Sequence, residues 1–224
     1  MRKNIFFLTA AVASIMFASC GSNASEAGAA DSAMTATAGS AAYTVEPNST
    51  LGWGGSKVVG IGSHAGTIAI SEGTISVENG NITAGSFTID MKKIVCTDSG
   101  LPAEFNAKLI GHLSADDFFN VEKFPTAKFV ISNVKAEANG ENTHVISGNL
   151  TLRDSTKNIS FPAAVSITET GLTAKGSTTI NRLDWGVNYD QANMSLPEKA
   201  AAKLKNGVVS KDITISFDLK ATKK

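Results

Sequence analysis

The feature that most constrains this chain is an alternation of apolar and polar residues with a period of two, from Tyr43 onward. Residues 159–167 are apolar at every odd position, with Ser160 and Ser166 between them, and residues 209–219 and 87–91 show similar alternation. Successive side chains of a strand point to opposite faces. The pattern therefore predicts an antiparallel sheet with one apolar face and one solvated face.

Turn signals divide this region into short strands, and glycine-rich stretches around Gly54 suggest sharp bends at barrel corners. Neighbouring runs can merge to give about eight strands, and closing the sheet removes its edges. We therefore expect an all-β fold, an extended eight-stranded antiparallel β-barrel. The expected turns are Ser71-Glu72-Gly73, Glu78-Asn79-Gly80-Asn81, Asn139-Gly140 and Thr170-Gly171, and the expected strands are 43–46, 51–59, 65–70, 73–78, 82–91, 125–137, 144–153, 157–168, 171–181 and 209–220.

An aromatic stretch interrupts the alternation between residues 105 and 129. Phe105 and Leu109 are spaced as on one helical face, which predicts a short helix at 102–110. A capping-type signal at Ser114 predicts a second helix at 115–119. We expect this stretch to form an apolar wall beside the barrel interior.

A third short helix is expected at 196–205, after the last turn signals of the sheet. Ser195 and Glu198 form a capping box, and Gly207 is suited to end the helix. We interpret this helix as a solvated surface element.

The N-terminus has the pattern of a bacterial lipoprotein signal. Two basic residues precede an apolar run, which ends at Ala18-Ser19-Cys20. We expect residues 1–19 to be a lipoprotein-type signal peptide and Cys20 to carry a lipid anchor. An ordinary signal peptide cut nearby is the alternative.

Residues 20–42 are small and polar, with almost no large apolar group, so we expect a flexible tether. Its roughly 22 residues would reach about 25 Å. The remaining 43–224 form the expected barrel domain. With Cys20 lipidated, we expect no disulfide and a buried Cys96.

Composition excludes several classes of function. The formal net charge of zero argues against nucleic acid binding, which needs a basic surface. The histidines, His64, His112 and His144, lack metal-ligand spacing, so we expect no metal and no cofactor. His112 with Asp117 is the one candidate acid–base pair, and we interpret it as part of a turn. We therefore expect a protein that is not an enzyme.

Several motifs occur in the order typical of the YceI-like family. They are Tyr43-Thr-Val-Glu-Pro47, His64-Ala-Gly66, His112-Leu113, Asp117-Phe-Phe119, Phe124-Pro125, Gly148-Asn-Leu-Thr-Leu-Arg153 and Asn181-Arg-Leu-Asp-Trp-Gly-Val187. The chain resembles this family over residues 43–220. The resemblance implies a lipocalin-like barrel that binds polyisoprenoids or similar long amphiphiles in a tubular cavity, commonly in the periplasm.

We therefore expect a carrier or reservoir for a polyisoprenoid, isoprenoid quinone or fatty-acyl lipid, anchored in the bacterial cell envelope, facing the periplasm or on the outer-membrane surface. The alternative is a barrel packed shut, acting as a structural or interaction module, because about eight strands allow either. Arg182 is a candidate for a polar head group, or for an ion pair with Asp184. The full set of expected ligand-binding residues is Trp53, Phe87, Ile89, Phe105, Leu109, Phe118, Phe119, Phe129, Ile131, Leu150, Phe161, Arg182, Trp185 and Phe217.

Overall fold

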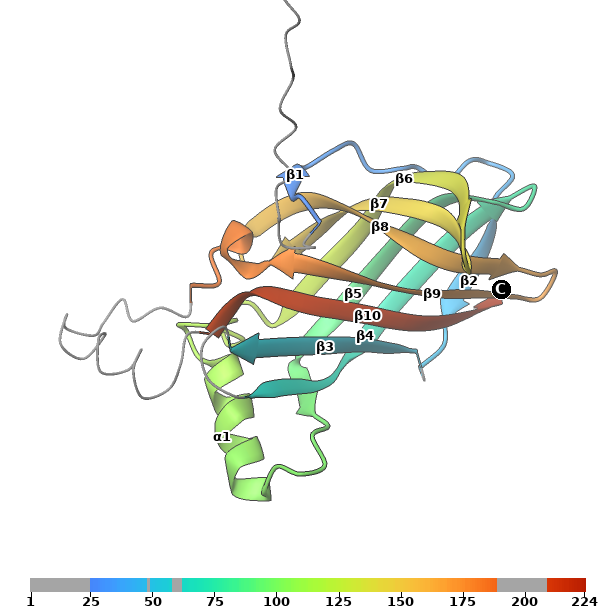
Figure 1. Ribbon diagram of the computed structural model, residues 1–224. Helices are drawn as coiled ribbons and strands as arrows, with labels where there is room; N and C mark the ends of the chain where they lie inside the picture. Colours follow the sequence, from blue (N-terminus) through green and yellow to red (C-terminus); the bar gives the residue numbers. More distant parts are fainter. Residues whose placement is uncertain (1–24, 48, 58–61, 189–208) are drawn as a thin grey trace, which may run out of the picture.

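The computed structural model describes residues 25–47, 49–57, 62–188 and 209–224. Within them the chain forms a closed antiparallel β-barrel (Figure 1), as the alternation predicts. The strands are β1 (Gly28–Ala29), β2 (Ala41–Val45), β3 (Thr50–Lys57), β4 (Ser63–Glu78), β5 (Asn81–Cys96), β6 (Thr126–Asn139), β7 (Asn142–Leu152), β8 (Ser155–Ile167), β9 (Gly171–Asn181) and β10 (Val209–Lys223).

The barrel has eight positions around its axis, because β2 and β3 share one. Both strands pair with β4 on one side and with β10 on the other. From β4 the ring continues through β5, β6, β7, β8 and β9, and it closes where β9 pairs with β10.

Three of the four expected turns lie between strands. Asn79 and Gly80 both have positive φ, 50° and 77°, as a tight hairpin between β4 and β5 requires. Residues 71–73 are the exception, because β4 runs straight through them. Its pairing with β5 shifts between Ile70 and Glu72, so the polar Ser71-Glu72 pair marks a bulge inside one long strand rather than a turn.

Residues 25–40, the N-terminal strap, lie across the outside of the barrel (Figure 1). Ser25 bonds to Thr179 of β9, and β1 pairs with β8. Further along, Asp31 and the side chain of Asn149 exchange two hydrogen bonds, of 2.9 and 2.7 Å. The expectation of a flexible tether over this segment is therefore wrong. Its small residues let the main chain approach the sheet closely enough to bond to it.

The strap bridges two places where neighbouring strands separate. Strands β8 and β9 pair only from Ala163 to Ile167, and the Ser25 hydroxyl bonds to the Ser160 carbonyl of β8 and to Thr178 of β9. Strands β5 and β6 pair only over Ser86–Asp90. There the strap bonds to Ile131 of β6 through the Met34 amide and to Thr83 of β5 through Ser40.

One of the expected helices is present. Helix α1 (Ala103–Ser114) follows Pro102 and extends the helix expected at 102–110 by one turn. Residues 115–119 form hydrogen-bonded turns instead of a helix, with Asn120 at positive φ. A 3-10 helix, η1 (Arg182–Trp185), ends at Gly186, whose φ is 66°. The helix expected at 196–205 lies outside the described residues, as do the signal peptide and Cys20.

Candidate binding cavity

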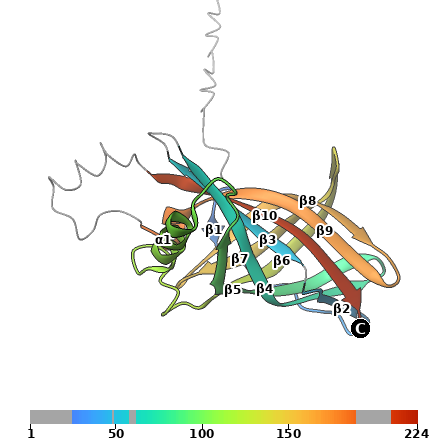
Figure 2. The same cartoon turned by 90° about the horizontal axis from the view of Figure 1, so that it is seen from below.

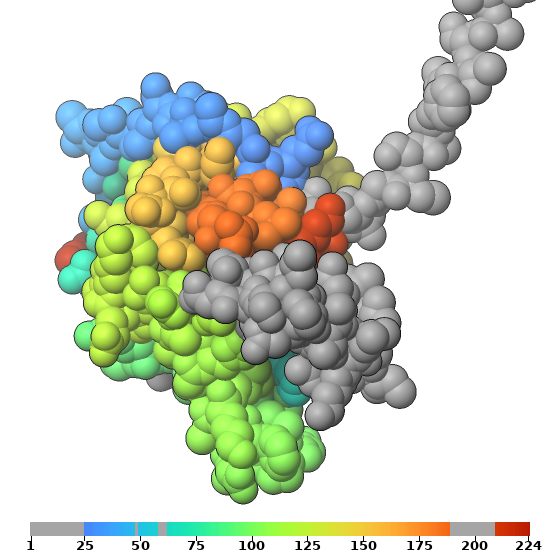
Figure 3. Space-filling view, turned by 90° about the vertical axis from the view of Figure 1, so that its left-hand side faces the viewer, coloured from blue at the N-terminus to red at the C-terminus, as the bar shows by residue number. Residues whose placement is uncertain are grey.

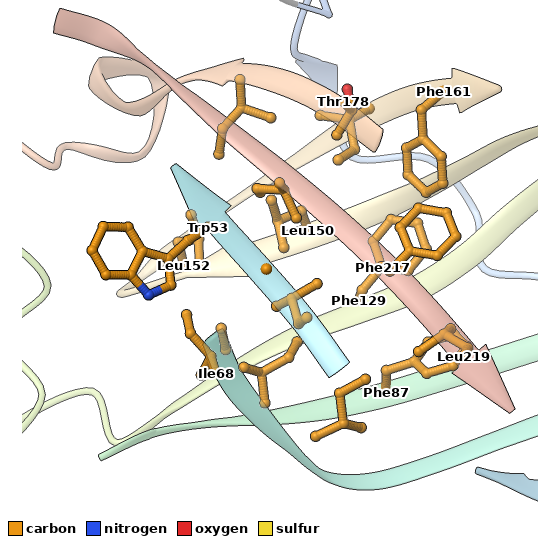
Figure 4. Close-up of a pocket in the computed structure, with 18 of the residues that line it drawn as sticks. Trp53, Ile68, Phe87, Phe129, Leu150, Leu152, Phe161, Thr178, Phe217 and Leu219 are labelled. Carbon is orange, nitrogen blue, oxygen red and sulfur yellow. The ribbon is translucent and has the colours of Figure 1, made fainter. Parts of the chain in front are cut away.

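The barrel contains an apolar cavity that opens to solvent at one end, and the space between its lining atoms, with the solvent at the opening included, is about 1190 Å³. Apart from Thr178 and Gly52, every described residue that lines it carries an apolar side chain, and these come from every strand position of the ring. Figure 4 shows them pointing into the barrel. Such a lining offers no charge and almost no hydrogen bond, so burial of apolar surface is the interaction it can make with a ligand.

Four phenylalanines form a row through the middle of the cavity (Figure 4). The ring centroids are separated by 6.3 Å between Phe87 and Phe129, 5.6 Å between Phe129 and Phe161, and 5.3 Å between Phe161 and Phe217. These are favourable spacings for tilted or edge-to-face rings. The row makes one continuous aromatic surface within the barrel.

The two ends of the cavity differ in exposure. At the end that holds the β4–β5 and β8–β9 turns, Tyr43, Ile75 and Leu172 are at most 3% exposed, and the Tyr43 hydroxyl donates to the Thr168 carbonyl. We call this the closed end. At the end that holds α1 and η1, the lining residues Trp53 and Phe119 stay partly exposed. This is the open end.

Nine of the residues expected from sequence do line the cavity: Trp53, Phe87, Ile89, Phe119, Phe129, Ile131, Leu150, Phe161 and Phe217. Eight of them lie in strands, and alternation along the strand directs their side chains inward. Phe119 is the exception, because it lies in the turns after α1. That they contact a ligand stays a prediction.

Three residues of the aromatic stretch do not line the cavity. Phe105 is 55% exposed, because it lies in the first turn of α1, where that helix stands away from the barrel. Leu109 packs on the edge of the core instead. Phe118 is buried, with its ring against Phe119 at 4.8 Å. Before β6 begins at Thr126, the stretch therefore supplies one lining side chain, that of Phe119.

Arg182 and Trp185 are structural in this fold and do not line the cavity. Arg182 is 4% exposed and donates to the carbonyls of Ser210 and Val187, with its guanidinium 5.8 Å from the Phe118 ring centre. Trp185 is fully buried and donates its indole N–H to the Leu150 carbonyl at 2.9 Å. Together they hold η1 against the ends of β7 and β10.

An ion pair lies at the rim of the open end. His64 Nδ1 is 2.7 Å from Asp98 Oδ2, and the Ala65 amide donates to the other carboxylate oxygen at 3.1 Å. The hydrogen bond from His64, aided by that amide and by the Cys96 thiol, lowers the pKa of Asp98 below its usual 3.8. Cys96 itself is buried, as expected. The pair fixes the chain between β5 and α1 to the start of β4.

His112 and Asp117, the candidate acid–base pair, do approach each other, with 3.6 Å between Nε2 and Oδ2. Both side chains are about 40% exposed, at 40% and 43%, and neither lines the cavity. The contact spans the turn after α1. Across the described residues, no group of three or more His, Cys, Asp or Glu side chains is arranged to hold a metal ion.

The lining residues missed from sequence are mainly aliphatic. Ile68, Met91, Ile180, Ile213, Ile215 and Leu219 share the inward parity of the predicted strands. The same alternation predicts their direction, although the expected set consists mainly of aromatic residues. Arg153 ends the family motif that begins at Gly148, but the motif does not indicate its role. It has a φ of 55° and donates to the carbonyls of Phe118 and Gly186, which ties the turn after α1 to the end of η1.

The closed antiparallel ring and its apolar interior define a lipocalin-like barrel with an internal cavity. The YceI-like domain profile matches residues 43–221, so the chain belongs to the YceI-like family. Relatives named UPF0312 protein are 30% identical over 98 residues in Pseudomonas putida and 36% identical over 118 residues in Pseudomonas aeruginosa. These matches cover 44% and 47% of this chain, and 47% and 60% of the relatives, so the chain spans about half the length of the curated relatives it matches.

Solved structures share the fold at low identity. BcnA of Burkholderia cenocepacia is 18% identical with a TM-score of 0.57, covering 79% of this chain and 98% of its own. A polyisoprenoid binding domain from Saccharophagus degradans is 14% identical with a TM-score of 0.54, covering 82% and 99%. The YceI protein of Campylobacter jejuni is 17% identical with a TM-score of 0.52, covering 75% and 90%.

Proposed function

We propose that this barrel binds the tail of a long-chain amphiphile, of the polyisoprenoid, isoprenoid quinone or fatty-acyl type, as a carrier or reservoir in the bacterial cell envelope. The observation that carries the proposal is the lining: it is apolar from the closed end to the open end except at Thr178. The Saccharophagus relative, described as polyisoprenoid binding, supports the same class of ligand.

The energetics of a tail favour reversible exchange. Each buried CH₂ contributes about 0.8 kcal/mol relative to water, so a five-carbon isoprene unit contributes roughly 4 kcal/mol. In a membrane the tail is already in hydrocarbon, and its transfer into the barrel changes the free energy little. This suits a carrier or reservoir, with binding rather than catalysis as its role.

The first test is to secrete residues 21–224 into the periplasm of the native host behind a cleavable signal peptide, to purify them without detergent and to analyse the extract by mass spectrometry. We expect a stoichiometric long-chain lipid. The second test measures uptake of cis-parinaric acid, a fluorescent polyene fatty acid, by the delipidated protein. An extract without lipid, together with no uptake of the probe, would contradict the proposal and favour the packed-barrel module.

Matched variants test whether the probe binds inside the barrel. Phe161→Glu puts a carboxylate among the rings of Phe129 and Phe217 and is expected to abolish uptake. Phe105→Glu makes the same change on an exposed side chain and should leave uptake intact. Ile215→Trp fills the cavity without adding charge, so it also blocks uptake even if Phe161→Glu fails to fold.

A further inference from the structure

The most exposed large apolar side chains are gathered at one end of the barrel. Among the described residues these are Val95 at 51%, Phe105 at 55% and Leu183 at 44%. Val95 is near the end of β5, Phe105 is in α1 and Leu183 is in η1, and all three elements lie at the open end (Figure 1). Single exposed hydrophobic residues are ordinary, so the observation of interest is that all three lie at the end where the cavity opens.

The strap fixes the N-terminal chain near the same end. Ser25 bonds to Thr178 and Thr179, two to three residues from the end of β9 at Asn181. Figure 3 looks onto this end and shows the strap, η1 and α1 on one face. The chain that precedes Ser25 therefore joins the barrel beside the opening of the cavity.

Chain length limits how the barrel can sit on a membrane that holds Cys20. However residues 20–24 are arranged, the five steps from Cys20 to Ser25 span at most about 18 Å. Along β9, the eight steps from Thr179 to Gly171 cover about 26 Å. A barrel standing on its closed end would need a longer connection than the chain supplies.

From these observations, we infer that the open end docks on the phospholipid surface in which Cys20 is anchored, with Val95, Phe105 and Leu183 entering the interface. The inference rests on the expected lipidation and deepens the proposed function, because it places the cavity opening at the source of the tail. Partly inserted apolar side chains are the usual anchors of such contacts. A second copy of this chain is the competing occupant.

The test uses the full lipidated chain in vesicles of phosphatidylethanolamine and phosphatidylglycerol. A fluorescent label is attached at Lys108→Cys in α1 or at Glu141→Cys in the β6–β7 turn of the closed end, each in a Cys96→Ser background. We expect doxyl lipids to quench the Lys108 label at least threefold more than the Glu141 label. Equal quenching, or stronger quenching at Glu141, would overturn the inference.

Variants show whether the apolar surface is responsible. The double variant Val95→Glu, Phe105→Glu should lose at least half of the quenching at Lys108, whereas Ala138→Glu, an exposed site near the closed end, should lose none. If the double variant and Ala138→Glu both retain the quenching at Lys108, the inference is wrong. It is also wrong if the chain forms dimers without vesicles and the double variant does not. Uptake of cis-parinaric acid by the same variants tests the proposed function separately. Docking can fail while uptake persists, and uptake can fail while docking persists.

Discussion

Two glycines in the barrel wall make room for the aromatic row. A Cβ on Gly148 would collide with the ring of Phe129, and one on Gly176 would lie 2.7 Å from both Phe217 Cζ and the Pro162 carbonyl oxygen. A ring can turn aside, but the Pro162 oxygen belongs to the main chain of β8. The absence of a side chain at these positions is therefore part of how the cavity is built.

We expect Gly176→Ala to lower the free energy of unfolding by about 1–3 kcal/mol, because the strand must shift to relieve the overlap. Urea unfolding measures the change. Gly55→Ala is the control: its Cβ meets no atom within 4 Å, so its effect should stay within about 0.5 kcal/mol. Equal losses in the two variants would contradict this explanation.

The rim ion pair makes a prediction about pH. Because the folded-state pKa of Asp98 is lowered, its contribution to stability is present above the usual value of 3.8 and disappears as pH falls through the lower folded value. We expect Asp98→Asn to reduce stability at pH 7 and to have little effect in strongly acidic buffer. Thermal unfolding of both proteins across this range checks it, and a difference independent of pH would count against the ion pair.

Strand parity could be predicted residue by residue, but burial of the aromatic stretch could not. Ile89, Leu150 and Phe217 point inward because alternation sets the face of a strand. The direction of Phe105 depends instead on where α1 leaves the barrel, which is set by contacts such as Asn106 to the Cys96 carbonyl. A helical spacing of apolar residues shows a shared face without showing what covers it.

At the scale of elements, the strap is the largest departure from the sequence-based expectation. Composition indicates whether a segment can form a core of its own. The strap needs no core of its own, because its main-chain amides and the hydroxyls of its short side chains bond to strands of the barrel. Two of its contacts, those of Ser25 and Met34, lie where neighbouring strands separate.

Met34→Asp should destabilise the barrel by about 1–2 kcal/mol, because it places a charge against the partly buried gap between β5 and β6. The matched control is Thr35→Asp, on the exposed neighbouring residue, which should be close to neutral. Hydrogen exchange would also show faster exchange of the Ile82–Gly85 amides in Met34→Asp alone. If the two variants behave alike, the strap contributes nothing at this point.

At the scale of the whole molecule, the last strand completes the ring at the end opposite α1, where β2 and the C-terminus meet (Figure 2). Ala221, Thr222 and Lys223 pair with Val45, Thr44 and Tyr43. Lys220 also exchanges hydrogen bonds of 3.0 and 2.9 Å with the Ser49 side chain, which is 4% exposed.

No described helix is long and apolar enough to cross a bilayer.

Removing residues 220–224 should therefore abolish cooperative unfolding, since it removes the pairing of β2 with β10, which closes the ring, and leaves Ser49 without its buried hydrogen bonds. Circular dichroism during heating shows this as a broad transition at lower temperature. Removing Lys224 alone deletes one bond, from its amide to the Ala42 carbonyl, and should preserve a sharp transition. A sharp transition in the longer truncation would contradict the role given to β10.

The pairing of β2 with β10 also determines when the barrel can close during synthesis and folding. The ring joins residues 43–45 to residues 221–223, so it cannot close until β10 has been made. Until then β2 and β3 hold open edges with unpaired amides and carbonyls, which are templates for pairing with other chains. Contacts this distant in sequence make folding slow. A nascent or truncated chain is thus the vulnerable species, and a chaperone that covers strand edges would act before the fifteen residues of β10 arrive.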